Sequence, residues 1–315
     1  MKKLLLAFVL LISITVTGFS QQTNVYSFFV NVVNESFRFP LIGFVNIARG
    51  SHSLPQIGFI NLNTNDFSSF QAGFVNTVGG NFSGAQISFI NTSAGDFNGF
   101  QSGFINTSKS LNGAQIGFVN TVWNDSTGFQ LGFVNTSVQK LQGVQIGFIN
   151  YVDSIENGIP IGFISIVRNG GYKAIEYSFS EFHPINIGIK LGVDGFYTTI
   201  IGAFNPSGDF NRGSFATGLG FGSLVPINNS FFINPELNFL STFHNHNQQL
   251  LSLVPNFGFN LNKNFSITVG PAVTWVANFN GNGEKIEPLF SIYNHDINES
   301  HSIVVGVRAS IRFRF

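Results

Sequence analysis

Apolar and polar residues alternate along the C-terminal half of the chain, from about residue 172 to its end. In the last segment Ile303, Val305 and Val307 fall on one face, whereas Ser302 and Arg308 fall on the other. Because successive side chains of a β-strand point to opposite faces, this period of two predicts strands. The expected strands cover 186–193, 196–204, 213–223, 230–241, 251–261, 264–275, 286–293 and 301–315.

The apolar face of these strands has the height of a membrane. Five to seven consecutive outward positions are apolar, and in tilted strands they make a band about 25 Å tall, which matches a bilayer core. The opposite face is rich in Gly, Asn, Ser and Arg, which suits a barrel interior better than a dry sandwich core. The chain ends on Phe315 in a strand, which resembles the C-terminal signature read by the barrel-assembly machinery. We therefore expect residues 171–315 to form an outer-membrane antiparallel β-barrel, with Phe315 as its assembly signal.

An internal repeat fills the N-terminal half of the chain. A Gly-Phe pair begins at Gly43, Gly58, Gly73, Gly103, Gly117, Gly132, Gly147 and Gly162, with Ser88-Phe89 in the one gap. The spacing is fifteen residues with one step of fourteen, and the unit reads Gly-x-Gln-x-Gly-Phe-(Ile/Val)-Asn-Thr. The residues expected to carry the repeat structure are Phe59, Phe74, Phe89, Phe104, Phe118, Phe133, Phe148, Asn61, Asn76, Asn91, Asn106, Asn120, Asn135, Gln71, Gln86 and Gln101. A second, shorter apolar position recurs at Phe67, Phe82, Phe97, Leu111 and Leu141.

Two architectures fit this repeat. In a β-solenoid each copy is one coil stacked in parallel on the next, with Phe stacks in the interior and ladders of Asn and Gln amides. Read as one strand, a copy places Phe133 and Asn135 on one face and Gln130 on the other. In the alternative, each copy is one antiparallel strand of a single transmembrane barrel of about 16–18 strands; such barrels alternate short turns with longer loops, so their natural repeat is a hairpin. We therefore favour a solenoid over residues 36–170, and the single barrel remains the alternative.

The first residues have the parts of a secretory signal peptide. Met1-Lys2-Lys3 is the positive region, Leu4 to Val16 is the apolar core, and Gly18-Phe19-Ser20 places small residues at the cleavage site. We expect residues 1–20 to be cleaved and residues 21–35 to supply a leading strand. No apolar run in the chain is long enough for a transmembrane helix, so a membrane location requires a closed barrel.

Composition excludes several classes of function. Charged residues make up 10% of the chain, against about 25% in ordinary soluble domains. Fifteen basic residues balance fifteen acidic ones, so the concentrated positive charge that nucleic-acid binding requires is missing. The chain has no cysteine, which excludes disulfides, thiolate catalysis and Cys-ligated zinc.

The residues that could carry chemistry form no complete catalytic or metal-binding set. His244 and His246 stand two apart in a polar stretch that we expect to be a solvated loop, because a zinc site needs further ligands. Glu176, Glu181 and Asp194 are expected to solvate the barrel interior or to form ion pairs rather than to catalyse. We therefore expect no enzyme activity, no metal and no cofactor.

Arginines concentrate on one face of the last strand. Arg308, Arg312 and Arg314 would give the barrel interior a preference for anions unless countercharges such as Glu236 neutralise them. Lys190 is a further cation expected to pair with the carboxylates of this region. The interior is thus expected to be polar and charged.

The order of these segments carries a family resemblance. After the repeats come Ile159-Pro-Ile-Gly-Phe-Ile-Ser-Ile-Val-Arg-Asn-Gly170, Asn186-Ile-Gly-Ile-Lys-Leu-Gly192 and Phe196-Tyr-Thr-Thr-Ile-Ile201. This arrangement resembles the surface-repeat outer-membrane proteins of Bacteroidetes, over nearly the whole mature chain. The resemblance implies an outer-membrane location and a repeat region followed by barrel strands, and it implies no activity.

The sequence therefore predicts an outer-membrane surface repeat protein with a structural or adhesive role. Its expected partners are outer-membrane lipid, the barrel-assembly machinery during biogenesis and an unidentified surface partner, and they include no nucleic acid. The alternative function is a passive, porin-like channel formed by a single large barrel.

Overall fold

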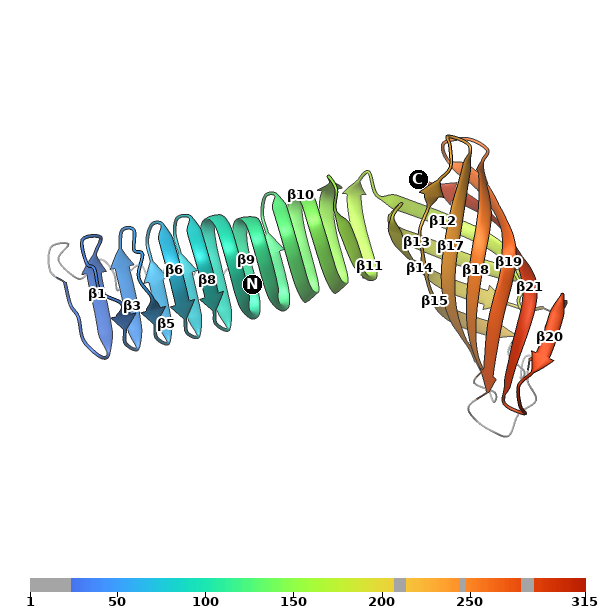
Figure 1. Ribbon diagram of the computed structural model, residues 1–315, viewed down its shortest axis with the longest axis horizontal. Helices are drawn as coiled ribbons and strands as arrows, with labels where there is room; N and C mark the ends of the chain where they lie inside the picture. Colours follow the sequence, from blue (N-terminus) through green and yellow to red (C-terminus); the bar gives the residue numbers. More distant parts are fainter. Residues whose placement is uncertain (1–23, 207–213, 244–247, 279–285) are drawn as a thin grey trace. The chain divides into compact units, whose positions relative to one another are not determined.

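The structure is a computed structural model that describes residues 24–206, 214–243, 248–278 and 286–315. Within these ranges the chain is all-β, with a β-solenoid of about nine turns followed by a closed antiparallel barrel of eight strands (Figure 1). The predicted fold class is thus confirmed. The expected signal peptide, residues 1–20, lies outside the described residues. No helix in the described part of the chain is long and apolar enough to cross a bilayer.

The chain divides into two units, Met1–Val138 and Gln139–Phe315. The first consists of solenoid coils, and the second contains the last coils and the barrel. The solenoid strands are β1 (Val30–Asn34), β2 (Leu41–Ile42), β3 (Val45–Arg49), β4 (Gln56–Ile57), β5 (Ile60–Asn63), β6 (Phe67–Ala72), β7 (Val75–Val78), β8 (Phe82–Ile87), β9 (Ile90–Val122), β10 (Ser126–Ile155) and β11 (Ile159–Asn169).

Equivalent residues of successive coils lie side by side in parallel. Gln71 on β6 opposes Gln86 on β8, and Asn61 on β5 opposes Asn76 on β7. All pairings between the solenoid strands of the described residues are parallel. The alternative of one large antiparallel barrel is therefore wrong, because the repeat of fifteen residues, with its one step of fourteen, builds parallel coils in register.

The interior of the first unit is filled by the second apolar position of the repeat. One buried cluster contains the side chains at this position, Phe67, Phe82, Phe97 and Leu111, together with Val78 and Val122. The prediction that the Gly-Phe rings fill the interior is wrong, because those rings are exposed. In the first coils the chain bends at this pair, as at Gly58-Phe59, and throughout the repeat the strand phase shifts between Gln and Asn, which are both buried although five residues apart. Both amides consequently point inward. The prediction that Gln and Asn lie on opposite faces of one strand is therefore wrong.

Close packing between coils explains the first glycine of the repeat unit. Gly113 has φ +143°, which L-residues rarely adopt, and a Cβ there would lie 2.0 Å from the carbonyl oxygen of Gly99 in the preceding coil. The Gly-x-Gln spacing is thus a steric requirement of the stack.

The leading segment forms part of the first coil. In the described part of the strand expected over residues 21–35, which starts at residue 24, β1 pairs in parallel with β3. An antiparallel bridge joins Val25 to Val32. This short antiparallel pairing covers the first coil, where a parallel neighbour would otherwise continue the stack.

The barrel strands are β12 (Tyr172–Phe179), β13 (Ile185–Val193), β14 (Phe196–Phe204), β15 (Phe215–Gly222), β17 (Phe231–Thr242), β18 (Gln248–Asn260), β19 (Phe265–Asn278) and β21 (His301–Arg314). Consecutive barrel strands are antiparallel, and pairing of β12 with β21 closes the ring. Short strands β16 (Val225–Pro226) and β20 (Tyr293–Asp296) pair at its margin. The strand expected over 286–293 is wrong, because the extended segment is β20 and it does not belong to the closed ring.

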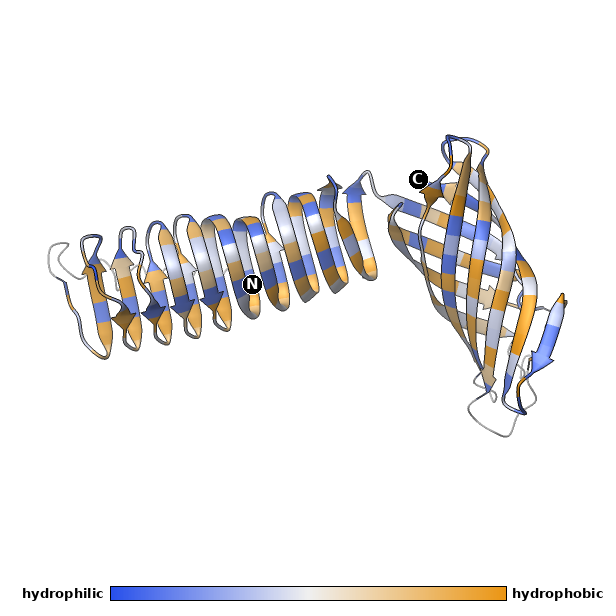
Figure 2. Cartoon of the chain, in the orientation of Figure 1, coloured by the Kyte–Doolittle hydropathy of each residue, from blue (hydrophilic) through white to orange (hydrophobic). Residues whose placement is uncertain are grey.

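Burial along the barrel strands alternates as the sequence pattern predicts. Exposed and buried residues alternate along nearly the whole of β17, and its exposed residues include Phe231, Ile233, Leu237 and Phe239. Figure 2 shows apolar and polar residues alternating along these strands. The outward positions are mostly apolar, whereas the interior positions include most of the polar and charged side chains together with one apolar cluster.

Candidate functional site

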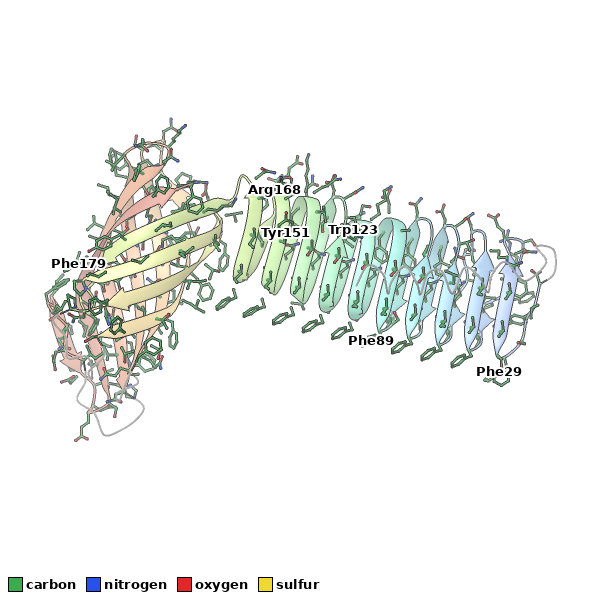
Figure 3. The ribbon with its side chains drawn as sticks, turned by 180° about the vertical axis from the view of Figure 1, so that it is seen from behind. Phe29, Phe89, Trp123, Tyr151, Arg168 and Phe179 are labelled. Carbon is green, nitrogen blue, oxygen red and sulfur yellow. The ribbon has the colours of Figure 1, made fainter. Side chains whose placement is uncertain are left out.

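One edge of the first unit carries a row of exposed phenylalanine rings, which we call the aromatic face (Figure 3). Adjacent rings are stacked with centroids 4.9–5.0 Å apart and planes within 1–2° of parallel. Each ring is 42–56% exposed. The row consists of Phe44, Phe59, Phe74, Phe89, Phe104, Phe118 and Phe133. Phe148 and Phe163 of the second unit form a similar stack, with centroids 4.7 Å apart.

The aromatic face is wholly free of charge. Its corner segments, 42–44, 57–59, 72–74, 87–89, 102–104, 116–118 and 131–133, contain only Ile, Leu, Ala, Gly, Ser and Phe. Ile57, Ile87, Ile116 and Leu131 are exposed beside the rings. Exposed apolar surfaces larger than a few hundred Å² are rare on monomeric soluble proteins and are typical of sites that contact proteins, membranes or ligands.

Charged and polar side chains gather at the opposite corner of the coils. Asp66 Oδ1 accepts a hydrogen bond from the backbone amide of Asn81 at 2.7 Å, and Asn81 Oδ1 accepts one from that of Asp96 at 2.9 Å. These side chains line a groove of about 640 Å³ with Ser68 and Ser83. Their hydrogen bonds brace the turn from one coil to the next, so we assign them a structural role.

A ladder of asparagine amides runs through the first unit beneath the aromatic face. Each Asn donates its side-chain N–H to the Oδ1 of the equivalent Asn in the next coil, at 2.7–3.1 Å, along the series Asn31, Asn46, Asn61, Asn76, Asn91, Asn106, Asn120 and Asn135. Most also donate to a backbone carbonyl of the neighbouring coil, as Asn61 does to Ala72 O at 2.8 Å. All are fully buried, so the ladder satisfies polar groups that would be costly to bury alone.

A second ladder of glutamines runs in the opposite sense. Gln71, Gln86, Gln101, Gln115 and Gln130 each donate to the Oε1 of the Gln in the preceding coil, at 2.6–2.8 Å. The side-chain dipoles of the two ladders therefore oppose each other along the stack. Together they fix the register of the coils, and this register is what aligns the exposed rings.

The glutamine ladder ends where the sequence changes. The position of the first coil equivalent to Gln56 is Leu41, which pairs with it in the parallel register. Gln56 Nε2 accordingly has no hydrogen-bond acceptor among the described residues. The amide ladders are thus finite, with an unfavourable end in the first coils.

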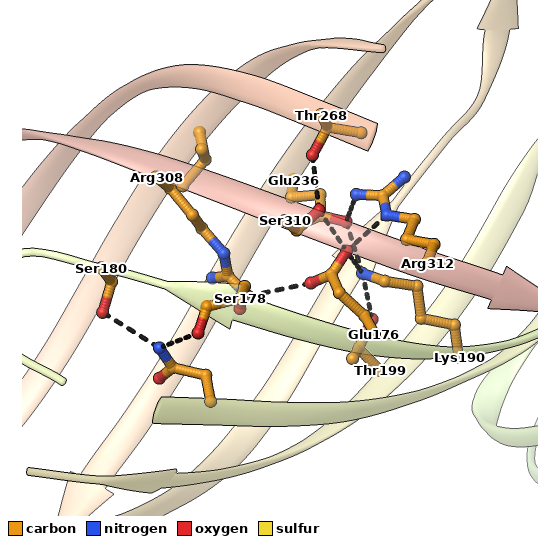
Figure 4. Close-up of polar contacts among 12 residues, drawn as sticks. Glu176, Ser178, Ser180, Lys190, Thr199, Glu236, Thr268, Arg308, Ser310 and Arg312 are labelled. Carbon is orange, nitrogen blue, oxygen red and sulfur yellow. Dashed lines mark hydrogen bonds and ion pairs between the residues drawn. The ribbon is translucent and has the colours of Figure 1, made fainter. Parts of the chain in front are cut away.

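The barrel interior holds a network of buried charges (Figure 4). Lys190 Nζ lies 2.6 Å from Glu236 Oε1 and 3.3 Å from Glu176 Oε2. Arg312 Nη2 donates to Glu236 Oε1 at 3.0 Å, and Arg312 Nε donates to Glu176. Tyr197 donates its hydroxyl to Glu236 at 2.6 Å. These side chains come from β12, β13, β14, β17 and β21, so the network ties strands across the ring.

A second layer closes the barrel at its other end. The connection between β12 and β13 folds inward, and Phe182 packs in an apolar cluster with Ile201, Leu240 and Val276. Glu181 accepts a hydrogen bond from Thr274 at 2.5 Å. Beside this connection the interior retains a cavity of only about 20 Å³, which has room for about one water molecule.

Among the described residues, side chains therefore cross the interior in two layers. Arg308 donates to Glu176 at 3.2 Å and to Ser178 at 3.0 Å, which joins the charged layer to the polar residues next to it. A hollow of about 500 Å³ lies at the barrel end lined by Tyr172, Asn262 and Arg314. It is a vestibule that the network closes, because its inner lining residue Arg312 is 2% exposed.

The structure resolves the roles of the acidic candidates. The expected ion pairing is confirmed for Glu176 with Lys190 and for Glu236 with Arg312. Asp194 does not join this group, because it pairs with Arg314 at the rim, 3.2 Å away. His244 and His246 lie outside the described residues. Among the residues that are described, no group of three His, Asp or Glu side chains could hold a metal ion.

Sequence reasoning missed the outward direction of the Gly-Phe rings and the inward connection at Phe182. A small residue precedes the Phe in every copy, Gly in eight and Ser88 in the ninth, and a Cβ at such a glycine would clash with the preceding coil, as at Gly58 with Gly43 O. Comparisons of the chain with protein-family models, curated proteins and solved structures found no match.

Proposed function

We propose that this chain is an outer-membrane protein in which the barrel is an anchor and the solenoid is a rigid scaffold with a structural or adhesive role. The observation that carries the proposal is the aromatic face. Seven stacked rings stay exposed on a unit whose interior is otherwise packed and hydrogen-bonded. Leaving so much apolar surface in water costs free energy unless a partner covers it.

The barrel supports the location. Its outward residues are apolar along whole strands, as Phe265, Ile267, Val269 and Val273 are on β19. An outward apolar band on a closed barrel satisfies every backbone hydrogen bond within the ring, as a lipid environment demands. Outer-membrane lipid is thus the partner we propose for this surface, and the barrel-assembly machinery is the one we propose during biogenesis.

The filled interior supports an anchor rather than a channel. The channel alternative depended on a single barrel of about 16–18 strands, whereas the barrel has eight. Its interior is crossed by the charged network of Glu176, Lys190, Glu236 and Arg312. In planar bilayers we expect no stepwise conductance from the purified full chain, and open steps on the nanosiemens scale would contradict the anchor.

Site-specific photocrosslinking tests the interaction role. A benzoyl-phenylalanine placed at Phe104 lies on the aromatic face, and one placed at Lys109 lies at the charged corner of the same coil. In irradiated cells that make the full chain, we expect a crosslinked product from position 104 and none from position 109. If position 104 gives no product, the aromatic face has no partner and the interaction role is rejected.

A further inference from the structure

The two ends of the barrel differ in the length of their connections. At the end where β12 begins, strands are joined by 194–195, 223–230 and 261–264. At the opposite end they are joined by 180–184, 205–214, 243–247 and 279–300. The two longest connections, 279–300 and 205–214, thus both lie at the second end, and the third longest, 223–230, lies at the first. Outer-membrane barrels place their short turns in the periplasm and their longer loops outside the cell.

An even number of strands brings both ends of the ring to the same side. The barrel has eight strands, β12 begins at Tyr172 and β21 ends at Arg314, and Ala174 pairs directly with Arg314. The start of the barrel and the end of the chain therefore both lie at the short-turn end.

The connection between the solenoid and the barrel is too short to change sides. Only Gly170 and Gly171 separate β11 from β12. The three peptide steps from Asn169 to Tyr172 span at most about 11 Å, whereas the apolar band of such a barrel is about 25 Å tall. The last coil also contacts this end of the barrel, since the hydroxyl of Thr198, near the start of β14, donates to Gly162 O of β11 at 2.5 Å.

We infer that the solenoid lies on the periplasmic side of the outer membrane, and that the aromatic face is offered to the periplasm. This inference rests on the proposed outer-membrane location. It settles a point that the sequence pattern leaves open, namely the side of the membrane on which the repeats lie. The partner of the aromatic face is then a periplasmic component rather than another cell or an extracellular ligand.

The absence of cysteine from the chain makes the inference directly testable by single-cysteine labelling. Three exposed positions report on the three regions: Ser83→Cys in the solenoid, Lys263→Cys in a short turn and Glu299→Cys in the longest connection. Each full-length variant is treated in cells with a bulky, membrane-impermeant maleimide, before and after the outer membrane is permeabilised. The parent chain is the control for background labelling.

We expect Glu299→Cys to react in intact cells, and Ser83→Cys and Lys263→Cys to react only after permeabilisation. Reaction of Ser83→Cys in intact cells overturns the inference, whichever way the other two behave. Fractionation of the same cells separates this from failure of the proposed function. If the chain is absent from the outer-membrane fraction, the outer-membrane location is wrong and the inference falls with it.

Discussion

Asn106 donates its side-chain amide to Asn120 Oδ1 at 2.8 Å, although these residues are separated by fourteen positions rather than fifteen. The missing residue falls at the charged corner, where Ala94, Gly95 and Asp96 of one coil correspond to Lys109 and Ser110 of the next. The coil absorbs the deletion there because that corner carries no ladder residue. The strands between Gln115 and Asn120, in contrast, carry both ladders.

This difference predicts where the repeat tolerates an insertion. A glycine inserted between Lys109 and Ser110 restores the fifteen-residue step, and we expect little change in the stability of the solenoid. A glycine inserted between Gly117 and Phe118 shifts one ladder by a residue and turns its amides from the interior toward solvent. We expect the denaturant midpoint, followed by far-UV circular dichroism of the full chain in detergent, to fall clearly only for the second insertion. Equal midpoints would show that the ladders do not set the register.

The glutamine ladder predicts a position-dependent cost for the same substitution. Gln101→Leu removes the bonds to Gln86 and from Gln115, both 2.7 Å long, and leaves Gln86 Oε1 buried without its donor. We expect a loss of about 2–4 kcal/mol in the free energy of unfolding. The measurement is chemical denaturation of the full chain.

Gln56→Leu is the matched control for this prediction. It removes one bond, from Gln71, but it also removes a buried N–H that has no acceptor, and Leu41 shows that the column accepts leucine. We expect a cost below about 1 kcal/mol. If both substitutions cost the same, the ladder contributes through volume rather than through hydrogen bonding.

His52 predicts a pH dependence of the first coils. It is 3% exposed and occupies the interior column next to Phe67, and its Nε2 has no partner among the described residues. Burial first, and the charge of Arg38 second, lower the pKa of His52 below its ordinary value of 6.5. The unfolded chain therefore takes up a proton near pH 6.5 while the folded chain does not, so stability is complete above this pH and falls as the pH decreases below it.

His52→Phe removes the titrating group and restores the residue type of the neighbouring coils. We expect the melting temperature of the wild-type solenoid to fall relative to this variant as the pH is lowered from 7.5 to 5. Thermal melts of both full-length chains at matched pH check this, and parallel curves would show that His52 does not titrate in that range.

The features that the sequence predicted are those set by local repetition. The Asn ladder follows from identical residues at a constant step, which parallel stacking places next to each other whatever the surroundings. The alternation on β19 and β21 is likewise a property of each strand alone. The direction of Phe104 could not be predicted by a strand period, because the phase changes between Gln101 and Asn106, which are both buried although five residues apart.

For the barrel network, the sequence predicted which charged residues lie in the interior but not which of them form pairs. Glu176 and Arg312 are far apart in sequence, yet they meet because β12 closes the ring against β21 with Glu176 opposite Arg312. That register depends on the number of strands and their stagger, neither of which appears in a single strand. The burial of Phe182 was unpredictable for a similar reason, since a connection folds inward only when the ring around it leaves room.

Glu236 links the network across the barrel, and it predicts a large effect of a small change. Its carboxylate accepts from Lys190, Tyr197 and Arg312 while it is 2% exposed. Glu236→Gln keeps the shape of the side chain but removes its negative charge. The three buried cations Lys190, Arg308 and Arg312 then share Glu176 as their ion-pair partner. Removing one partner of a buried ion pair costs about 3–5 kcal/mol, because the remaining charge is desolvated without compensation.

Heating before semi-native gel electrophoresis measures this effect, since the folded barrel and the unfolded chain migrate differently. We expect Glu236→Gln to unfold at a markedly lower temperature than the parent, and the exposed Glu299→Gln to behave like the parent. Combining Glu236→Gln with Lys190→Met removes the uncompensated cation, so the double variant should recover part of the loss. A double variant less stable than Glu236→Gln alone would show that Lys190 stabilises the barrel by packing against Tyr197, over whose ring its ammonium lies, and not by its pairing with Glu236.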